Sequence, residues 1–192
     1  MSGGLSIGGD TSGSVLLYPT PVAGATTYTL AANSGTINPG APLIRASGTS
    51  TQSVSSGTFN VVQLPSKMFD TNNCFNNTGS TVTLNGLSVP AYSFCPNVAG
   101  YYQLNGYIII QGTITRYILS FYKNGNQYSR PVDITYSTSY VYYTGSDLIY
   151  LNGTGDYVNL QAYVVGSGLS IYTPTLVNGE APSFSAAWVR GA

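Results

Sequence analysis

The stretch Phe94-Cys95-Pro96-Asn97-Val98-Ala99-Gly100-Tyr101-Tyr102 decides how this 192-residue sequence is interpreted. It predicts an extended segment, a turn shaped by Pro96 and Gly100, and a strand that opens with two tyrosines. Farther along, residues 120–125 predict a strand that runs into an Asn-Gly hairpin turn, because both central positions of a type I′ turn favour positive φ. Asn85-Gly86 predicts a second turn of this kind.

Short runs rich in Val, Ile, Tyr and Thr recur along the whole chain, and Gly, Pro, Asn and Ser separate them. This pattern is typical of all-β sandwiches and barrels, and no run shows the helical spacing of apolar residues. The expected strands are residues 14–18, 26–31, 59–64, 81–84, 100–111, 114–123, 139–143, 147–151, 157–165 and 183–189. The sequence therefore predicts an all-β fold.

Residues 157–164 alternate between aliphatic and uncharged polar side chains. Since strand side chains point to opposite faces in turn, one set is expected in the core. The core set is Val158, Leu160, Ala162 and Val164, and the opposite set is Tyr157, Asn159, Gln161 and Tyr163. A face of tyrosines and amides without Lys or Glu favours a subunit interface or a ligand platform.

Residues 59–192 resemble the C1q/TNF-like domain, a trimeric jelly roll. The motifs that carry the resemblance are, in chain order, Phe69-Asp70, Phe75-Asn76, residues 94–102, residues 120–125, residues 155–160 and Phe184-Ser185-Ala186. Ala186 stands where the family usually has glycine, and Trp188 is larger than expected. The resemblance implies an antiparallel jelly-roll β-sandwich that forms a homotrimer.

Six large side chains are expected either in the protomer core or along the threefold axis that the resemblance implies. They are Tyr101, Tyr102, Phe121, Leu160, Phe184 and Trp188. A monomer core alone is the other interpretation, because aromatic side chains bury a large area with little loss of rotamer entropy.

Composition divides the chain into three parts: an N-terminal β arm at residues 1–31, a linker or extended arm at 32–58, and the jelly roll at 59–192. Residues 32–57 are small, polar and rich in turn formers, which is typical of linkers. Residues 12–32 resemble a motif of tail-fibre and related virion proteins of tailed bacteriophages. The alternative is a plain hairpin that packs on the main domain.

Charge is scarce and balanced, with six basic and six acidic residues, so charged residues make up 6% of the chain. This balance predicts no binding to nucleic acid or anionic membrane, and it favours self-association. No segment has the ~20 apolar residues that span a bilayer, so membrane insertion is not expected. The first ten residues lack a secretory signal, which predicts synthesis in a cytoplasm, from which the protein could leave by another route such as cell lysis.

Histidine is absent, which excludes Ser/His/Asp and Cys/His nucleophile sets and histidine-based metal sites. The acids are scattered and are expected in structural or turn roles: Asp10, Asp70, Asp133, Asp147, Asp156 and Glu180. The sequence therefore predicts neither an enzyme nor a bound metal or cofactor.

Cys74 and Cys95 are the only two cysteines. They are expected as buried free thiols, with a disulfide as the alternative if their strands are neighbours. Asn76 and Asn152 begin N-glycosylation patterns, which are interpreted as coincidence in a chain rich in Asn and Thr.

Four tyrosines lie among Ser and Thr in residues 134–143, a mixture typical of paratopes and sugar platforms. They are Tyr136, Tyr140, Tyr142 and Tyr143, the predicted receptor contacts. An edge strand in a tyrosine-rich protein is the alternative interpretation.

Taken together, these features predict a homotrimeric bacteriophage virion protein, made in the host cytoplasm. Residues 1–58 would attach it to other virion proteins, and the jelly roll would serve as a tail or tail-fibre component that contacts a host-surface glycan or protein. The alternatives are a capsid decoration or head-fibre protein, a short polysaccharide-degrading enzyme, and a cellular C1q-like recognition module.

Overall fold

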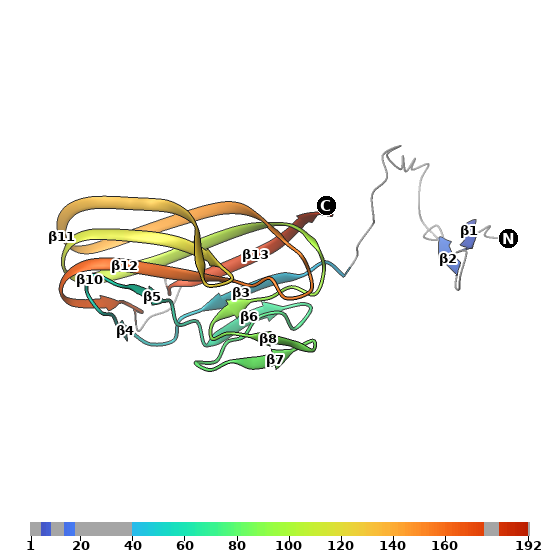
Figure 1. Cartoon of the computed structure of the whole chain (residues 1–192), viewed down its shortest axis with the longest axis horizontal. Helices are drawn as coiled ribbons and strands as arrows, with labels where there is room; N and C mark the ends of the chain where they lie inside the picture. Colours follow the sequence, from blue (N-terminus) through green and yellow to red (C-terminus); the bar gives the residue numbers. More distant parts are fainter. Residues whose placement is uncertain (1–4, 9–13, 18–39, 175–180, 192) are drawn as a thin grey trace, which may run out of the picture. The chain divides into compact units, whose positions relative to one another are not determined.

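The computed structural model describes residues 5–8, 14–17, 40–174 and 181–191 (Figure 1). The chain forms two compact units, Met1–Gly35 and Thr36–Ala192. In the first unit, β1 (Leu5–Gly8) pairs antiparallel with β2 (Ser14–Leu17). The expected strand at 26–31 and most of the segment resembling tail-fibre proteins lie outside the described residues.

The described part of the second unit consists of strands, turns and loops without a helix, which confirms the all-β prediction. Its strands are β3 (Leu43–Ser47), β4 (Gln52–Ser53), β5 (Phe59–Val61), β6 (Ser66–Asp70), β7 (Val82–Leu84), β8 (Leu87–Val89), β9 (Ser93–Phe94), β10 (Gly100–Lys123), β11 (Asn126–Leu151), β12 (Val158–Ile171) and β13 (Ser183–Arg190).

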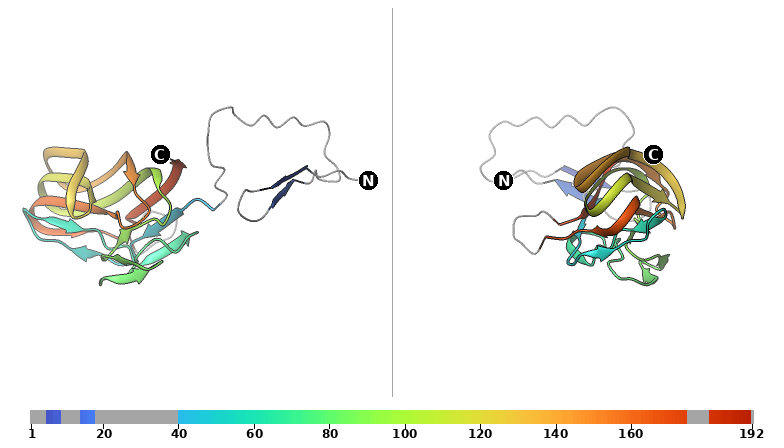
Figure 2. Two further views of the ribbon diagram at one scale, coloured as in Figure 1. Left: turned by 45° about the vertical axis from the view of Figure 1, so that its right-hand side comes forward. Right: turned by 90° about the vertical axis from the view of Figure 1, so that its left-hand side faces the viewer.

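Two layers form because the two longest strands, β10 and β11, each run through both of them (Figures 1 and 2). The first layer has the order β6-β3-β13-β10-β11 and uses the first half of β10 and the second half of β11. The second layer joins the first half of β11 to the second half of β10 and then to β12, which also pairs with β4, β5 and β9. This arrangement is an antiparallel jelly-roll β-sandwich.

Glycines shape the bend where β10 passes from one layer to the other. Pairing with β12 shifts register between Gln111 and Thr113 and again after Ile114. Gly112 has φ +135° and Gly166 has φ +150°, conformations that side chains with a Cβ rarely adopt. A Cβ on Gly166 would also overlap the carbonyl oxygen of Thr113, so the strands come this close only because the residue is glycine.

The core lies between the two layers and is closed by side chains from both. Ile44, Leu104 and Phe184 come from the first layer, and Phe121 and Leu160 from the second, all at most 1% exposed. The rings of Phe121 and Phe184 lie 6.3 Å apart, centre to centre, across the sandwich. The inward set predicted for β12 is confirmed, since Val158, Leu160, Ala162 and Val164 are all buried.

The two predicted Asn-Gly turns are confirmed. Asn124 and Gly125 have φ values of 52° and 79° between β10 and β11. Asn85 and Gly86 have φ values of 51° and 78° between β7 and β8, whose hairpin lies at the border of the unit (Figure 1). The strands expected at 139–143 and 147–151 join into the single strand β11, because Gly145 and Ser146 continue its pairing with β10.

The prediction that residues 32–58 form a linker or extended arm is wrong for the second half of this segment. β3 pairs with both β13 and β6, and Ile44 and Ala46 are fully buried in the core. β4 adds to the edge of β12. The domain therefore begins near residue 36 and not at 59, because two aliphatic residues in a polar segment suffice for a short strand when strands pair with it on both sides.

Candidate interaction face and its surroundings

One broad surface of the second unit is the outward side of the first layer, here called the front face. The strand register aligns its side chains in rows that cross the layer. One row holds Ser146, Asn105, Ser185, Arg45 and Phe69, and the next holds Leu148, Gln103, Ala187 and Leu43. The alternate residues of these strands form the core, so the rows point away from it.

One end of the front face is apolar. Its exposed side chains are Leu43, Phe69, Tyr101, Leu148, Tyr150 and Val189, with exposed fractions between 37% and 52%. The rings of Tyr101 and Tyr150 lie 5.6 Å apart, and a hollow of about 240 Å³ opens between Tyr101, Leu148, Val189 and Arg190. Exposed apolar side chains that gather in this way on a protein surface are typical of interaction sites.

The middle of the front face is a polar basin of about 610 Å³. Its lining consists of Arg45, Asn105, Gly106, Tyr107, Pro131, Thr144, Gly145, Ser146, Ser183 and Ser185. Hydroxyl and amide groups dominate this lining, and Arg45 is its only charged group. The basin therefore offers hydrogen-bonding groups and a single positive charge.

A tyrosine cluster lies at the other end of the front face. The ring of Tyr140 is 4.9 Å from that of Tyr142 and 5.8 Å from that of Tyr172, both in edge-to-face contact. Loss of solvent and the hydrogen bond with Tyr142 raise the pKa of Tyr140 above its usual value. Tyr140 is therefore neutral at ordinary pH, and the cluster presents ring edges and hydroxyls.

Ion pairs in the described residues use most of the charges that the chain has. Lys67 pairs with Asp70 at 3.3 Å, and Lys123 pairs with Asp156 at 2.8 Å. Arg116 and Arg130 each lie 2.9 Å from Asp133 on the second layer, and their hydrogen bonds lower the pKa of this carboxyl. The described charged residues outside these ion pairs are Arg45, Asp147 and Arg190.

The outward side of β12 makes contacts with its own chain. Asn159 is 6% exposed, and its amide donates to the hydroxyl of Ser93 at 3.2 Å. The ring of Phe59 lies 5.1 Å from that of Tyr122 and 5.2 Å from that of Tyr163. This surface, expected as an interface or platform, is thus partly filled from within the protomer, because β5 and β9 pair with β12.

The four tyrosines predicted as receptor contacts lie in different surroundings. Tyr136 and Tyr142 are 66% and 55% exposed, whereas Tyr140 is half-buried in the tyrosine cluster. Tyr143 is 8% exposed, its ring lies 4.9 Å from that of Tyr117, and burial raises its pKa. The strand period separates them, since Tyr143 points into the core and Tyr142 points outward.

The six residues predicted at the core or a threefold axis also divide. Tyr102, Phe121, Leu160 and Phe184 belong to the protomer core. Tyr101 lies on the front face, and Trp188 is half-buried, with its indole nitrogen 3.3 Å from the carbonyl oxygen of Ala99. Of these six residues, only Tyr101 and Trp188 retain solvent-accessible surface that is available to a partner.

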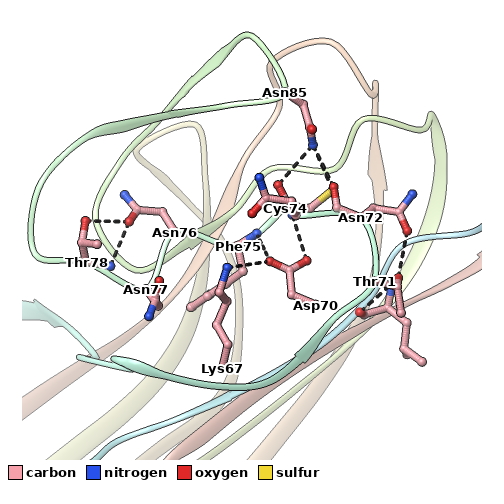
Figure 3. Close-up of polar contacts among 12 residues, drawn as sticks. Lys67, Asp70, Thr71, Asn72, Cys74, Phe75, Asn76, Asn77, Thr78 and Asn85 are labelled. Carbon is pink, nitrogen blue, oxygen red and sulfur yellow. Dashed lines mark hydrogen bonds and ion pairs between the residues drawn. The ribbon is translucent and has the colours of Figure 1, made fainter.

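Both cysteines are buried free thiols on neighbouring segments. The backbone nitrogen of Cys95 donates to the carbonyl oxygen of Cys74 at 2.8 Å, and burial raises the pKa of both thiols to about 11. Asp70 holds the adjoining turn by accepting from the backbone nitrogens of Cys74 at 2.8 Å and Phe75 at 3.0 Å, as Figure 3 shows. The predicted structural role of Asp70 is thereby confirmed.

Asn76 anchors the segment that carries the β7–β8 hairpin. Its amide nitrogen donates to the carbonyl oxygens of Ser80, Val89 and Pro90 at 2.7 to 2.9 Å. Its oxygen accepts from the backbone and the hydroxyl of Thr78, both at 2.8 Å (Figure 3). At 1% exposed, this side chain offers no site for a glycan.

No group of three or more Cys, Asp or Glu residues gathers as a metal site in the part of the chain that the structure describes. The same residues contain no helix that is long and apolar enough to cross a membrane.

The apolar end of the front face and Arg45 were missed in the sequence. Leu148 and Tyr150 alternate with the buried Ile149 and Leu151, so the alternation was visible but its outward side was not identifiable. Arg45 fell in the segment interpreted as a linker.

Comparison with solved structures supports the jelly-roll assignment. The globular domain of zebrafish complement 1qA protein matches with a TM-score of 0.50 and 16% identity, over 79% of this chain and 99% of that chain. Murine APRIL matches with a TM-score of 0.51 and 10% identity, over 77% of this chain and 98% of that chain. No family model matches the sequence, and no curated protein matches it significantly. The second unit therefore has a C1q/TNF-like fold. At identities this low, the matches establish the fold and nothing further.

Proposed function

We propose that the chain is a homotrimeric structural protein of a bacteriophage virion that contacts the host surface. The observation that carries the proposal is the front face, an apolar and tyrosine-bearing surface with little charge that the described part of the protomer leaves open. A jelly roll with such a face is suited to assembly and binding, and the described residues gather no group of three or more Cys, Asp or Glu that could hold a metal ion.

Self-association is supported by a second open feature, the edge strand β11. Among the described residues β11 pairs only with β10, so a strand from Asn126 to Leu151 has one unpaired side. An exposed edge of this length invites contact with another chain. When the front face of one copy contacts the β11 edge of the next, the contact is head-to-tail. Repeated contacts of this kind close into a ring when the rotation between neighbouring copies permits it.

The place on a virion rests on the resemblance of residues 12–32 to tail-fibre proteins and on the division of the chain into two units. In this proposal the first unit attaches to other virion proteins and the jelly roll is displayed. Three copies would present three identical sites, so that avidity compensates for weak single contacts.

Host contact is assigned to the exposed tyrosines Tyr136 and Tyr142 of β11. Their rings offer stacking surface, and neighbouring Ser and Thr hydroxyls offer hydrogen bonds to a glycan or protein. Alanine at both positions is expected to reduce adsorption of the purified chain to host cells at least ~10-fold, whereas Tyr128→Ala, at a similarly exposed position, leaves it unchanged. Binding to empty capsids and not to cells would instead establish a capsid decoration protein.

The trimer itself is tested by size-exclusion chromatography with light scattering. The full chain is expected at three times the protomer mass of 20.2 kDa. Leu148→Asp puts a charge into the apolar end of the front face and is expected to give monomers at micromolar concentration. The matched control is Tyr128→Asp, 49% exposed against 48% for Leu148 but on the other half of β11. A monomeric wild-type chain would contradict the proposal.

A further inference from the structure

We infer that Arg45 of one copy forms an ion pair with Asp147 of the neighbouring copy, and that this pair fixes the register of the ring. The inference rests on the proposed homotrimer and names the contact that orients it. It assigns the polar basin to a carboxylate of a second copy of this chain.

The charges of the protomer point to this pair because so few of them lack a partner. Lys67, Lys123, Arg116 and Arg130 all have carboxylates within 3.3 Å. In a chain with only six acids, Asp147 is the described carboxylate that has no ion pair. One of its oxygens accepts from the neighbouring Leu148 backbone at 2.7 Å, and its side chain is half-buried.

Arg45 is the better of the two cations left on the front face. It is half-buried in the basin of about 610 Å³, among the hydroxyls of Ser183 and Ser185, and no acid lines this basin. Arg190 is engaged by its own chain, since its Nε donates to the carbonyl oxygen of Gly191 at 3.2 Å and its guanidinium lies 5.9 Å from the Tyr101 ring centre.

The two groups are too far apart to pair within one protomer. Arg45 lies on β3, and Asp147 lies on the edge strand β11, with β13 and β10 between them. Three strand spacings of ~4.8 Å place their backbones ~14 Å apart, before any offset along the strands. A pair therefore requires a second copy.

Their positions match a head-to-tail contact. Asp147 lies on the open edge strand opposite the buried Leu104, so its side chain leaves the layer on the side away from the front face. Arg45 lies on the front face, so a head-to-tail contact in which the edge of one copy rests on the face of the next brings the two together. Each interface of a closed ring then contains one Arg45 and one Asp147. A charge pair between uncharged surroundings specifies the register, because a slipped contact leaves a guanidinium without its carboxylate.

A charge exchange tests the pair. Arg45→Asp and Asp147→Arg, each alone, are expected to weaken trimer association roughly 10-fold or more per interface, measured by sedimentation equilibrium. The double variant is expected to return to within about 3-fold of the wild type, as a restored pair predicts. The matched control exchanges Arg190→Asp with Asp147→Arg, which should give no recovery.

Circular dichroism of each variant monitors folding, and a second experiment avoids reversed charges. Arg45→Cys with Asp147→Cys is treated with a short bis-maleimide, since native Cys74 and Cys95 are buried. Covalent trimers are expected on a denaturing gel; Arg45→Cys with Thr135→Cys is the control that should give none.

The outcomes separate the pair from the trimer. A wild-type trimer whose double variant shows no recovery and no crosslink overturns the ion pair and leaves the proposed trimer standing. A monomeric wild type overturns both. Intact assembly of Arg45→Asp together with lost adsorption to cells would also overturn the pair, since Arg45 would then bind an anionic ligand in the basin.

Discussion

Single buried polar residues determine how the loops of this jelly roll are held. Asn76 and Asp70 each bond several backbone groups, and neither faces solvent (Figure 3). A buried amide that satisfies three carbonyl oxygens orders a segment that has few apolar contacts of its own. These residues stabilise the border of the domain and leave the front face free for partners.

Asn76→Ala is expected to lower the free energy of unfolding by about 2–4 kcal/mol, because three carbonyl oxygens lose their donor and the buried amide is not replaced. Urea unfolding monitored by tryptophan fluorescence measures the change. Asn126→Ala is the control, since its single amide bond to Asn124 is exposed, and a change within about 0.5 kcal/mol is expected. Equal losses for both variants would show that Asn76 is no anchor.

The stability of the turn after β11 is expected to depend on acid pH through Asp156. Burial raises the pKa of this carboxyl, but hydrogen bonds from Lys123, Asn124 and the Asn152 backbone outweigh burial and hold the pKa below its usual 3.8. The carboxylate therefore stabilises the folded state above pH 3.8, and this contribution is lost as pH falls through the lower folded value. Thermal unfolding scans from pH 6 to pH 2 should show a smaller loss for Asp156→Asn than for the wild type.

At the scale of elements, three long strands account for the jelly roll. β10 and β11 each bend from one layer to the other, and β12 extends the second layer along β10, so that one continuous ladder encloses the core. Bends of this kind need residues that tolerate close backbone approach, and glycines supply them at the β10–β12 contact.

Gly166→Ala is expected to destabilise the domain by more than about 2 kcal/mol, because φ is +150° and the new methyl group would overlap the carbonyl oxygen of Thr113. Gly57→Ala is the control that has backbone strain without steric overlap, because the φ of Gly57 is +73° and no atom lies within 4 Å of an added Cβ. Its expected loss is about 1 kcal/mol, from strain alone. Urea midpoints that are the same for both variants would mean that β10 does not need this close approach.

At the scale of the whole molecule, the two units have separate tasks in the proposed function. The jelly roll begins near Thr36, so the attachment unit is shorter than its composition indicates. The open front face and the open edge belong to the jelly roll alone, so the proposed assembly is expected to depend on residues 36–192.

Deletion of residues 1–35 is therefore expected to leave a folded jelly roll that assembles as the full chain does. Deletion of residues 1–57 removes β3 and β4, exposes the core side of Phe184 and takes away Ile44, so a protein that aggregates or stays unfolded is expected. Circular dichroism with light scattering compares the two. A folded 58–192 fragment would contradict the assignment of β3 to the core.

The sequence by itself determined the all-β class, both Asn-Gly turns, the inward side of β12 and the resemblance to a C1q/TNF-like jelly roll. These features depend on local rules, namely the period of two in a strand, positive φ in a turn, and the order of motifs along the chain. The tertiary structure alone decided that residues 43–53 belong to the domain, that Tyr143 is buried while Tyr142 is open, and that Arg45 and Leu148 share one face. Those facts depend on which strands pair across more than a hundred residues, and alternation marks two sides of a strand without telling which side another layer will cover.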